Sequence, residues 1–300
     1  MIEARGLTKR FGDVVAVEDL TFDVEPGRVT GFLGPNGSGK STTMAMIMGL
    51  DHPSAGDVTI SGKRYRDLRW PLREVGGLLE ARAIHPGRTA RTHLRSLAQY
   101  NDIDQSRVDV VLDKVGLSDV ATKRVGKFSL GMGQRLGIAA ALLGDPAVVL
   151  LDEPVNGLDP EGIRWTRTLC RSLAAEGRTV FISSHLMAEM ALTADQLVVI
   201  GKGRLIAEMP VADFVAQSST NSFRVRVDSP DIFAKAVREV QGDVVTNTDG
   251  SMMVSGIDAT TIGDMALSLR VAIYELTAQA SLEDAFMELT GASVEYRGAS

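Results

Sequence analysis

The chain has 300 residues, of which 44% are hydrophobic and 23% are charged, and it contains 30 Gly, 10 Pro and one Cys. This composition is typical of a folded globular protein and excludes a collagen-like or intrinsically disordered chain. The net charge of −6 argues against a nucleic-acid-binding protein, since such proteins are usually basic. The single cysteine, Cys170, allows no internal disulfide and fits a reducing compartment.

The charge is unevenly distributed along the chain. Residues 63–95 contain nine basic and three acidic residues, a local charge of +6, so the rest of the chain carries −12. Such asymmetry often marks a surface that meets another molecule, although a solvated helix face gives the same count.

The sequence predicts a soluble protein. Its first ten residues lack the apolar segment of a secretion signal, and no window approaches the roughly 20 apolar residues that span a bilayer. Any membrane role is therefore expected to depend on a partner.

In chain order, the first predicted elements are strands. Residues 14–17 and 20–24 are β-branched or alternate in polarity, and residues 29–33 form a short apolar strand. This strand leads into a glycine-rich loop and then into a helix whose methionines, Met44, Met46 and Met48, are interpreted as its packing face.

The middle of the chain alternates between helices and strands. Helices are predicted at 90–100 with Thr89 as its cap, from 104 or 106 to 115, at 133–143, and from Pro160 onward. Strands are predicted at 147–151, 179–183 and 196–200. Alternating strands and helices indicate an α/β domain with a parallel sheet.

The pattern changes near Pro210, which predicts a second domain covering 211–300. Strands are expected at 222–227, within 243–254 (two) and at 271–277, and helices at 231–240, 259–270 and 282–289. The order β-α-β-β-α-β suits a small ferredoxin-like α+β module followed by a helix.

Residues 34–41 match the pattern G-x-x-x-x-G-K-[ST], between a predicted strand and a predicted helix. Glycines let backbone N–H groups turn toward phosphate, Lys40 reaches the β- and γ-phosphates, and the Ser41 hydroxyl binds Mg²⁺. The candidate nucleotide-binding residues are Gly34, Pro35, Asn36, Gly37, Ser38, Gly39, Lys40, Ser41 and Thr42.

Two carboxylates end the aliphatic strand at 147–151. Asp152 stands where a P-loop NTPase holds Mg²⁺, and Glu153 is placed to orient or deprotonate a water in line with the γ-phosphate. The pair means little alone, but together with the loop at Gly34 it predicts a nucleoside triphosphatase.

Residues 128–135, Phe-Ser-Leu-Gly-Met-Gly-Gln-Arg, resemble the signature sequence of the ATP-binding cassette (ABC) ATPases, roughly Leu-Ser-Gly-Gly-x-x-Gln-Arg. Residues 156–159 resemble the D-loop of that family, His185 its switch histidine, and Phe11 its adenine-stacking aromatic residue. Six motifs lie in the order of the family across residues 1–210.

The resemblance implies an α/β P-loop NTPase fold of ABC-ATPase type. This fold has a RecA-like core, an antiparallel β subdomain and a helical subdomain, here at about 85–143, in a domain covering 1–210. It also implies binding of ATP and Mg²⁺, with Phe11 on the adenine, Glu153 as the base and His185 at the γ-phosphate.

A further implication is a head-to-tail homodimer with ATP between the copies. In it, Asp159 links the two sites and the signature reaches the ATP of the other copy. The signature residues concerned are Ser129, Leu130, Gly131, Met132 and Gln134.

Two positions depart from the family pattern. Leu130 replaces the first signature glycine, which puts close approach to phosphate at that position in question. Glu80 stands where the family has a glutamine that contacts Mg²⁺ and water. A carboxylate binds Mg²⁺ more strongly than an amide, so Glu80 is predicted to serve as a ligand together with Ser41 and Asp152.

The resemblance implies a transporter subunit working with a separate membrane permease on the cytoplasmic face of the membrane. The tail at 281–291 resembles that of ABC-2-type exporters, including the drug-resistance group, which favours export. It also places the basic segment at 63–95 on the face that meets the permease near an anionic membrane.

The alternative is an ABC ATPase that acts on nucleic acid or the ribosome. Repair members insert a long coiled coil between loop and signature, but only 88 positions separate Lys40 from Phe128, without a heptad run. Ribosome-associated members carry two cassettes, whereas this chain has one. A GTPase switch needs an N-K-x-D motif, which the sequence lacks. A non-enzymatic scaffold would be expected to lose Lys40 or Glu153, and both are present.

Overall fold

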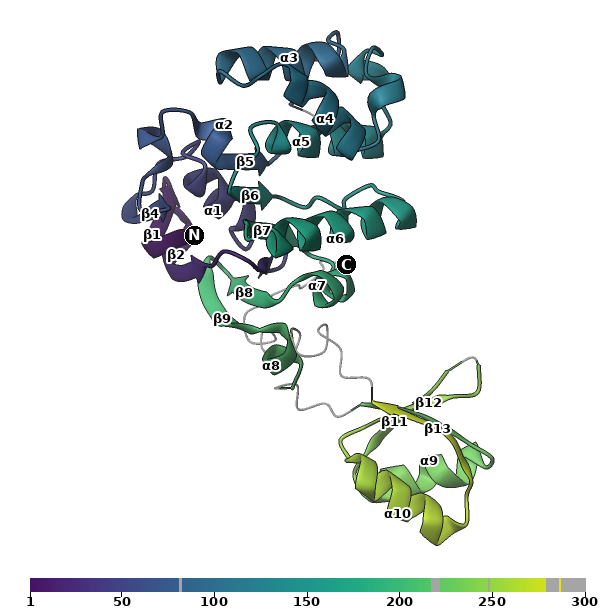
Figure 1. Ribbon diagram of the computed structural model, residues 1–300. Helices are drawn as coiled ribbons and strands as arrows, with labels where there is room; N and C mark the ends of the chain where they lie inside the picture. The colour runs from purple at the N-terminus through teal and green to yellow at the C-terminus, as the bar shows by residue number, and fades with distance from the viewer. Residues whose placement is uncertain (81–82, 217–221, 248, 279–285, 287–300) are drawn as a thin grey trace. The chain divides into compact units, whose positions relative to one another are not determined.

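The computed structural model describes residues 1–80, 83–216, 222–247, 249–278 and 286, which form two compact units. The first is Met1–Pro210 and the second begins at Val211 (Figure 1). Within the described part of the chain, every helix is too short or too polar to cross a membrane.

The centre of the first unit is a six-stranded sheet with the order β5-β6-β7-β3-β8-β9, parallel except for the antiparallel edge strand β9. Its strands are β3 (Val29–Leu33), β5 (Val75–Leu78), β6 (Val148–Leu151), β7 (Thr179–Ser184), β8 (Gln196–Gly201) and β9 (Arg204–Pro210). Strands β3, β6 and β7 are buried throughout, as parallel strands covered on both faces should be. The predicted α/β fold and the four predicted strands of this sheet are confirmed, whereas β5 and β9 were not predicted.

Strand β5 escapes prediction because two of its four residues are glycines, which are depleted in strands. Packing explains them. A Cβ on Gly76 would lie 1.9 Å from the carbonyl oxygen of Ala141 in helix α5 (Leu130–Leu142), and one on Gly77 would lie 2.5 Å from Met48 Cε. Helix α5 therefore packs directly on β5, the edge strand that pairs with β6.

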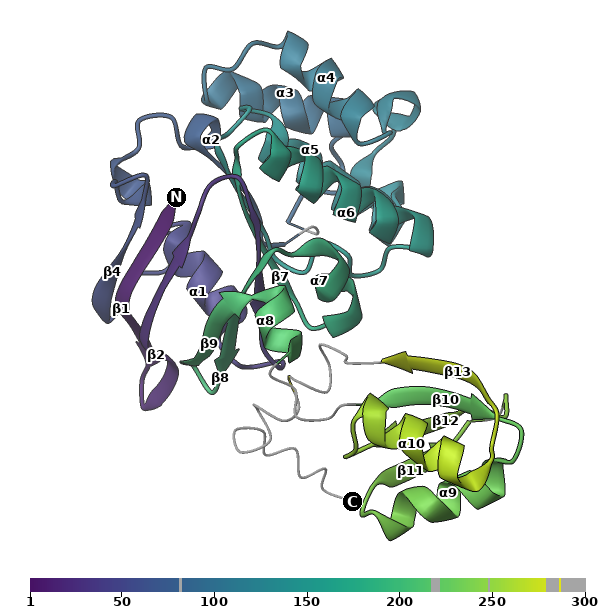
Figure 2. The ribbon, with the colours of Figure 1, turned by 60° about the horizontal axis from the view of Figure 1, so that its bottom comes forward.

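Different layers cover the two faces of this sheet (Figure 2). Helices α5, α6 (Pro160–Ala175) and α7 (Met187–Thr193) cover one face. Helix α6 contains the fully buried Cys170, whose thiol pKa is raised by burial to about 12, so the thiol is inert in the folded protein.

Helix α1 (Lys40–Ile47) and a three-stranded antiparallel sheet cover the other face. That sheet has the order β2-β1-β4, with β1 (Ile2–Phe11), β2 (Val14–Val24) and β4 (Ala55–Ile60). The predicted strands at 14–17 and 20–24 are both parts of β2. Met44 and Met46 are buried in this core, as predicted, beside a cluster of Phe22, Phe32 and Phe181.

A helical segment follows the short helix α2 (Pro71–Glu74) and β5. It contains α3 (Ala90–Tyr100), α4 (Ser106–Lys114) and α5. Thr89 caps α3 as predicted, accepting the N–H of Thr92 at 3.1 Å. Helix α5 begins at Leu130 rather than 133, because the Ser129 hydroxyl accepts the N–H of Met132 at 3.2 Å and caps the helix earlier.

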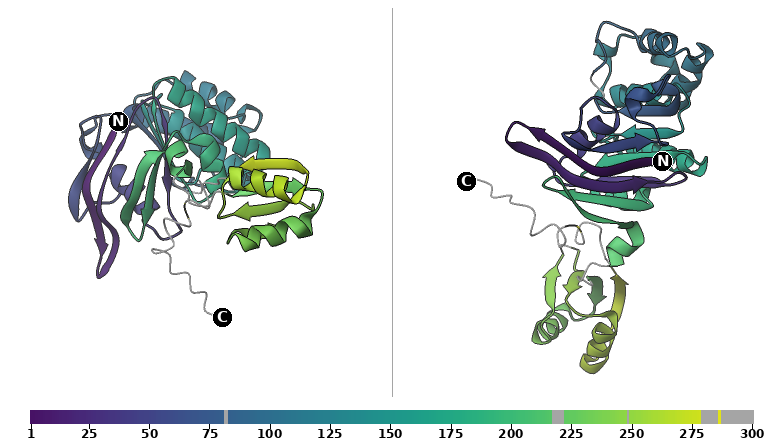
Figure 3. Two further views of the ribbon diagram at one scale, coloured as in Figure 1. Left: turned by 90° about the horizontal axis from the view of Figure 1, so that it is seen from below. Right: turned by 90° about the vertical axis from the view of Figure 1, so that its left-hand side faces the viewer.

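The second unit begins with helix α8 (Val211–Ala216) and contains an antiparallel sheet with the order β11-β12-β10-β13. Its elements are β10 (Phe223–Val227), α9 (Pro230–Glu239), β11 (Asp243–Thr246), β12 (Met252–Ser255), α10 (Ala259–Leu269) and β13 (Ile273–Ala278). The predicted β-α-β-β-α-β order is confirmed, and both helices lie on one face of the sheet (Figure 3). Apart from Phe286, the predicted helix at 282–289 and the tail at 281–291 lie outside the described residues.

Candidate functional site

Residues 34–42 connect β3 to α1 and form the loop in which the sequence predicts phosphate binding. Gly37 and Gly39 have φ angles of 80° and 102°, which side-chain-bearing residues rarely adopt. A Cβ on Gly39 would also lie 2.6 Å from the carbonyl oxygen of Ala16. The glycines thus allow a tight loop that opens toward the amino end of α1, where helix N–H groups favour an anion.

Lys40 lies folded over this loop and is only 6% exposed. Its Nζ donates to the carbonyl oxygens of Gly34 (2.7 Å) and Pro35 (3.3 Å) and lies 3.9 Å from Glu153 Oε1. Burial lowers the pKa of Lys40, and the carboxylates of Glu153 and Asp152 oppose that shift. The ammonium group is thus held where phosphate oxygens would be stronger acceptors than neutral carbonyls.

Asp152 and Glu153 follow the last residue of β6. The backbone N–H of Asp152 donates to Leu78 O at 2.7 Å, which ties this turn to the end of β5. Asp152 is 9% exposed, and its carboxylate accepts a hydrogen bond from the Ser183 hydroxyl. The first acidic residue is therefore fixed from both neighbouring strands.

Glu153 is held at both backbone groups and at its carboxylate. Its N–H donates to Ser183 Oγ (2.9 Å), and its carbonyl oxygen accepts from Gln134 Nε2 (3.1 Å). Its Oε2 lies 2.8 Å from His185 Nδ1. Lys40 and His185, which belong to two other motifs, thus both lie beside the carboxylate of Glu153.

Lys40, Glu153 and His185 face an open pocket of about 290 Å³. It is lined by Ala16, Asn36, Gly37, Gly39, Lys40, Ser41, Thr42, Glu153, Asn156 and His185. Its size is near the roughly 300 Å³ at which small-molecule sites begin. Gly34, Pro35 and Ser38 build the loop beneath it, where the Ser38 hydroxyl is buried without a hydrogen-bond partner among the described residues.

Asp152, described above, is not among the residues that line this pocket, and neither are the predicted site residues Phe11, Glu80 and Asp159. Phe11 is half exposed at the end of β1, with Lys9 Nζ 4.8 Å from its ring centroid. Glu80 is exposed two residues beyond β5. Asp159 caps α6 by accepting the N–H of Gly162 at 2.8 Å.

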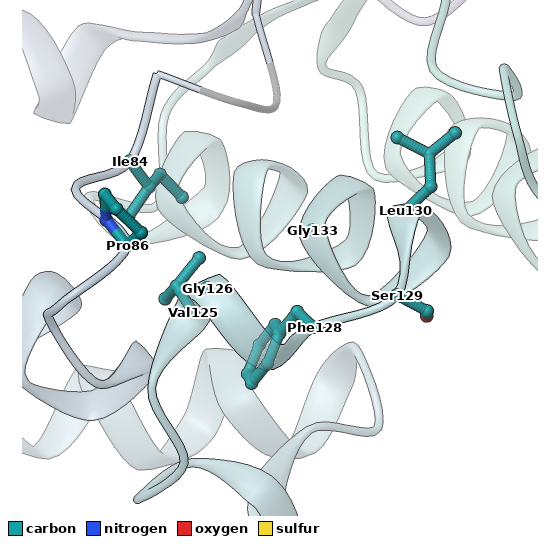
Figure 4. Close-up of a pocket in the computed structure, with 8 residues that line it drawn as sticks. All are labelled: Ile84, Pro86, Val125, Gly126, Phe128, Ser129, Leu130 and Gly133. Carbon is teal, nitrogen blue, oxygen red and sulfur yellow. The ribbon is translucent and has the colours of Figure 1, made fainter.

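The signature-like residues surround the amino end of α5, at a second pocket of about 360 Å³ (Figure 4). This pocket is lined by Ile84, Pro86, Val125, Gly126, Phe128, Ser129, Leu130 and Gly133. Leu130 packs on Gly157 in the turn before α6, so closely that a Cβ on Gly157 would lie 2.0 Å from Leu130 Cδ2. Gln134 is buried and, through its bond to Glu153, interacts within its own chain.

Sequence reasoning missed Ser183 and the position of Asn156 in the pocket. Ser183 carries a signal that could have been used, since it is a polar residue near the carboxyl end of a buried parallel strand, where α/β proteins place their sites.

A glycine loop between a parallel strand and a helix, a buried lysine, and an acidic pair at the end of β6 define a P-loop nucleoside triphosphatase. A family model described as ABC transporter matches residues 17–156. The chain is also 35% identical over 300 residues to the uncharacterized ABC transporter ATP-binding protein YhcH of Bacillus subtilis, covering 98% of this chain and 97% of that protein. The chain belongs to the family of ABC transporter ATP-binding proteins, the ATP-hydrolysing subunits of these transporters.

Other relatives are named for transport. The bacitracin transport ATP-binding protein BcrA of Bacillus licheniformis is 43% identical over 213 residues, 70% of each chain. The Nod factor export ATP-binding protein I of Burkholderia lata is 34% identical over 304 residues, 98% of each chain. These names favour transport over the alternative of an ATPase acting on nucleic acid or the ribosome. A second family model, a domain of unknown function (DUF8746), matches residues 221–283.

Solved structures give the same fold. The ATP-binding subunit of an ABC transporter matches with a TM-score of 0.66 and 28% identity, over 72% of this chain and 92% of that chain. A dimeric ATP-binding cassette in a post-hydrolysis state with ADP and Pi gives a TM-score of 0.65 over 70% of this chain and 99% of that chain. At 23% identity the second likeness establishes the fold alone.

Proposed function

We propose that this chain binds ATP with Mg²⁺ in the pocket beside Lys40, dimerises around the nucleotide, and drives export through a separate permease. It would act at the cytoplasmic face of the membrane. The observation that carries the proposal is the meeting of Lys40, Glu153 and His185 at the phosphate loop. The names of the transport and export relatives support the direction.

The donor groups at this site suit Mg²⁺. The cation prefers hard oxygen ligands and usually takes one or two protein carboxylates together with substrate phosphates. The Ser41 hydroxyl and the Asp152 carboxylate would hold it, with Glu80 as a further ligand. When bound, Mg²⁺ would neutralise charge on the phosphate oxygens.

Nucleotide binding and hydrolysis are assigned to separate groups. Phe11 would stack on adenine, and the loop at 34–42 with Lys40 would hold the phosphates. Glu153 would take the proton of the attacking water, while His185, 2.8 Å from its carboxylate, would orient that carboxylate and the γ-phosphate.

A second copy of the chain would supply the signature. Ser129, Leu130 and Gly131 are not among the residues that line the nucleotide pocket, and the chain carries one cassette. In a head-to-tail homodimer, Ser129 and Gly131 would approach the partner's ATP, with Met132 beside them and Asp159 linking the two sites. ATP would close the dimer because only the closed state makes both sets of contacts.

The basic segment at 63–95 is the proposed docking side for the permease. Three of its arginines are already paired with acids outside it: Arg64 with Asp57, Arg73 with Asp102 and Arg91 with Asp109. Arg88 and Arg95 are exposed, so they are better placed for an anionic membrane or partner surface.

Affinity capture of membrane proteins by the tagged full chain tests this part of the proposal. A permease should be recovered with the wild-type chain and much less with Arg88→Gln/Arg95→Gln, while the ATPase activity of the isolated chain stays unchanged. Adding Arg91→Gln should weaken capture little further, because Arg91 already pairs with Asp109. Undiminished capture by the double variant would make these arginines an ordinary solvated face.

Glu80→Gln is expected to raise the Mg²⁺ concentration needed for half-maximal ATPase activity. Removing one charge about 4 Å from a divalent cation costs about 2 kcal/mol in water, or roughly 30-fold, and more where water is excluded. Titration of Mg²⁺ against steady-state phosphate release measures the shift, with Glu74→Gln from the same segment as the control. An unchanged Mg²⁺ dependence and turnover would show that the Glu80 charge is unimportant.

A further inference from the structure

One serine lies between the two acidic residues of the site. Ser183 Oγ donates to Asp152 Oδ1 and accepts the backbone N–H of Glu153 at 2.9 Å, and Ser183 is fully buried. Strands β6 and β7 are paired as far as Leu151 and Ile182, so the residues that follow these two, Asp152 and Ser183, lie side by side. The sheet register thus fixes this contact.

The hydrogen bonds of Ser183 have a defined direction. A serine hydroxyl has one proton and two acceptor lone pairs. Because the N–H of Glu153 approaches Oγ as a donor, the hydroxyl proton goes to Asp152. This bond fixes the orientation of the Asp152 carboxylate, which would hold Mg²⁺.

The second contact of Ser183 supports an uncommon backbone conformation. Glu153 has a φ of 47°, and the left-handed region costs a residue with a side chain about 1–2 kcal/mol. Ser183 binds the N–H of Glu153 and Gln134 binds its carbonyl oxygen, so both backbone groups of the turn are held. This turn directs the Glu153 carboxylate toward Lys40 and His185.

We infer that Ser183 is a positioning residue for ATP hydrolysis, whose single hydroxyl orients both the Asp152 carboxylate and the Glu153 turn. The inference rests on the roles proposed above for these two acids. Ser183 acts through them, since it is not among the residues that line the nucleotide pocket. Removing a group that orients a metal ligand typically weakens metal binding or activity by about 10- to 100-fold.

The test is Ser183→Ala in the full chain. It should lower kcat by about 10- to 100-fold and weaken Mn²⁺ binding to the complex with a non-hydrolysable ATP analogue by at least about tenfold. Electron paramagnetic resonance of Mn²⁺ measures the second effect independently of activity. Metal-free binding of the analogue should stay at its wild-type value, because Lys40 and the glycine loop are unaltered.

Thr179→Val is the matched control. It removes another buried hydroxyl from the other end of β7, where Thr179 Oγ1 accepts from the amino terminus at 3.0 Å. Its kcat and Mn²⁺ affinity should equal those of the wild type. Equal losses in both variants, or wild-type kcat and Mn²⁺ affinity in Ser183→Ala, would overturn the inference.

The same assays separate this inference from the proposed function. If Glu153→Gln is inactive while Ser183→Ala behaves as wild type, only the role of Ser183 fails. If Glu153→Gln hydrolyses ATP normally, the assignment of the base fails, whatever Ser183→Ala does.

Discussion

Glu153→Gln is expected to abolish steady-state ATP hydrolysis while ATP still binds. The amide keeps the shape of the side chain but cannot accept a proton from water, and a positioned general base contributes about 10²- to 10⁴-fold. Phosphate release should therefore fall by at least about 100-fold. Because the γ-phosphate is not removed, size-exclusion chromatography with ATP should show a persistent dimer.

Glu176→Gln controls for the loss of a carboxylate. Glu176 pairs with Arg178 at the end of α6 and takes no part in the pocket, so this variant should hydrolyse ATP normally. Phosphate release by Glu153→Gln at the wild-type rate would remove Glu153 from the role of base.

Lys40→Ala is expected to lose most of its affinity for ATP. Hydrogen bonds to charged groups contribute about 1.5–3 kcal/mol each, which corresponds to roughly 10- to 100-fold in affinity. The variant also leaves the carbonyl oxygens of Gly34 and Pro35 without their ammonium donor. Equilibrium titration with a fluorescent ATP analogue measures the loss.

Lys114→Ala in the last turn of α4 is the control for charge, and thermal unfolding shows whether each variant remains folded. Nucleotide affinity equal to that of the wild type in a folded Lys40→Ala protein would refute the phosphate-binding role of the lysine.

Local signals in the sequence predict the core of this fold well. Strand 29–33 and helix 90–100 have the predicted bounds, since one is a continuous apolar run and the other has a threonine cap. The glycines of β5 hide that strand, because their requirement comes from α5 packing on Gly76. The capping role of Ser129 was likewise not predicted. Its hydroxyl accepts the N–H of Met132, so α5 begins at Leu130 rather than at 133.

The candidate site is predictable where one motif carries the chemistry, as at Lys40, Glu153 and His185. Their meeting at one carboxylate depends on sheet order, which the sequence does not spell out. The same holds for Ser183, whose partners are 30 or more positions away. The intrachain bond of Gln134 to Glu153 depends on where α5 lies against β6.

The contact between Leu130 and Gly157 makes the residue choices at these two positions interdependent. With leucine at 130, a Cβ at 157 would lie 2.0 Å from a leucine methyl carbon, and the φ of 72° adds a backbone penalty. Glycine at 130, as in the family signature, would lift the first restriction and leave the second. Leucine at 130 therefore adds a steric restriction at 157 to the one that the backbone already imposes, and redesign of the signature has to consider both positions together.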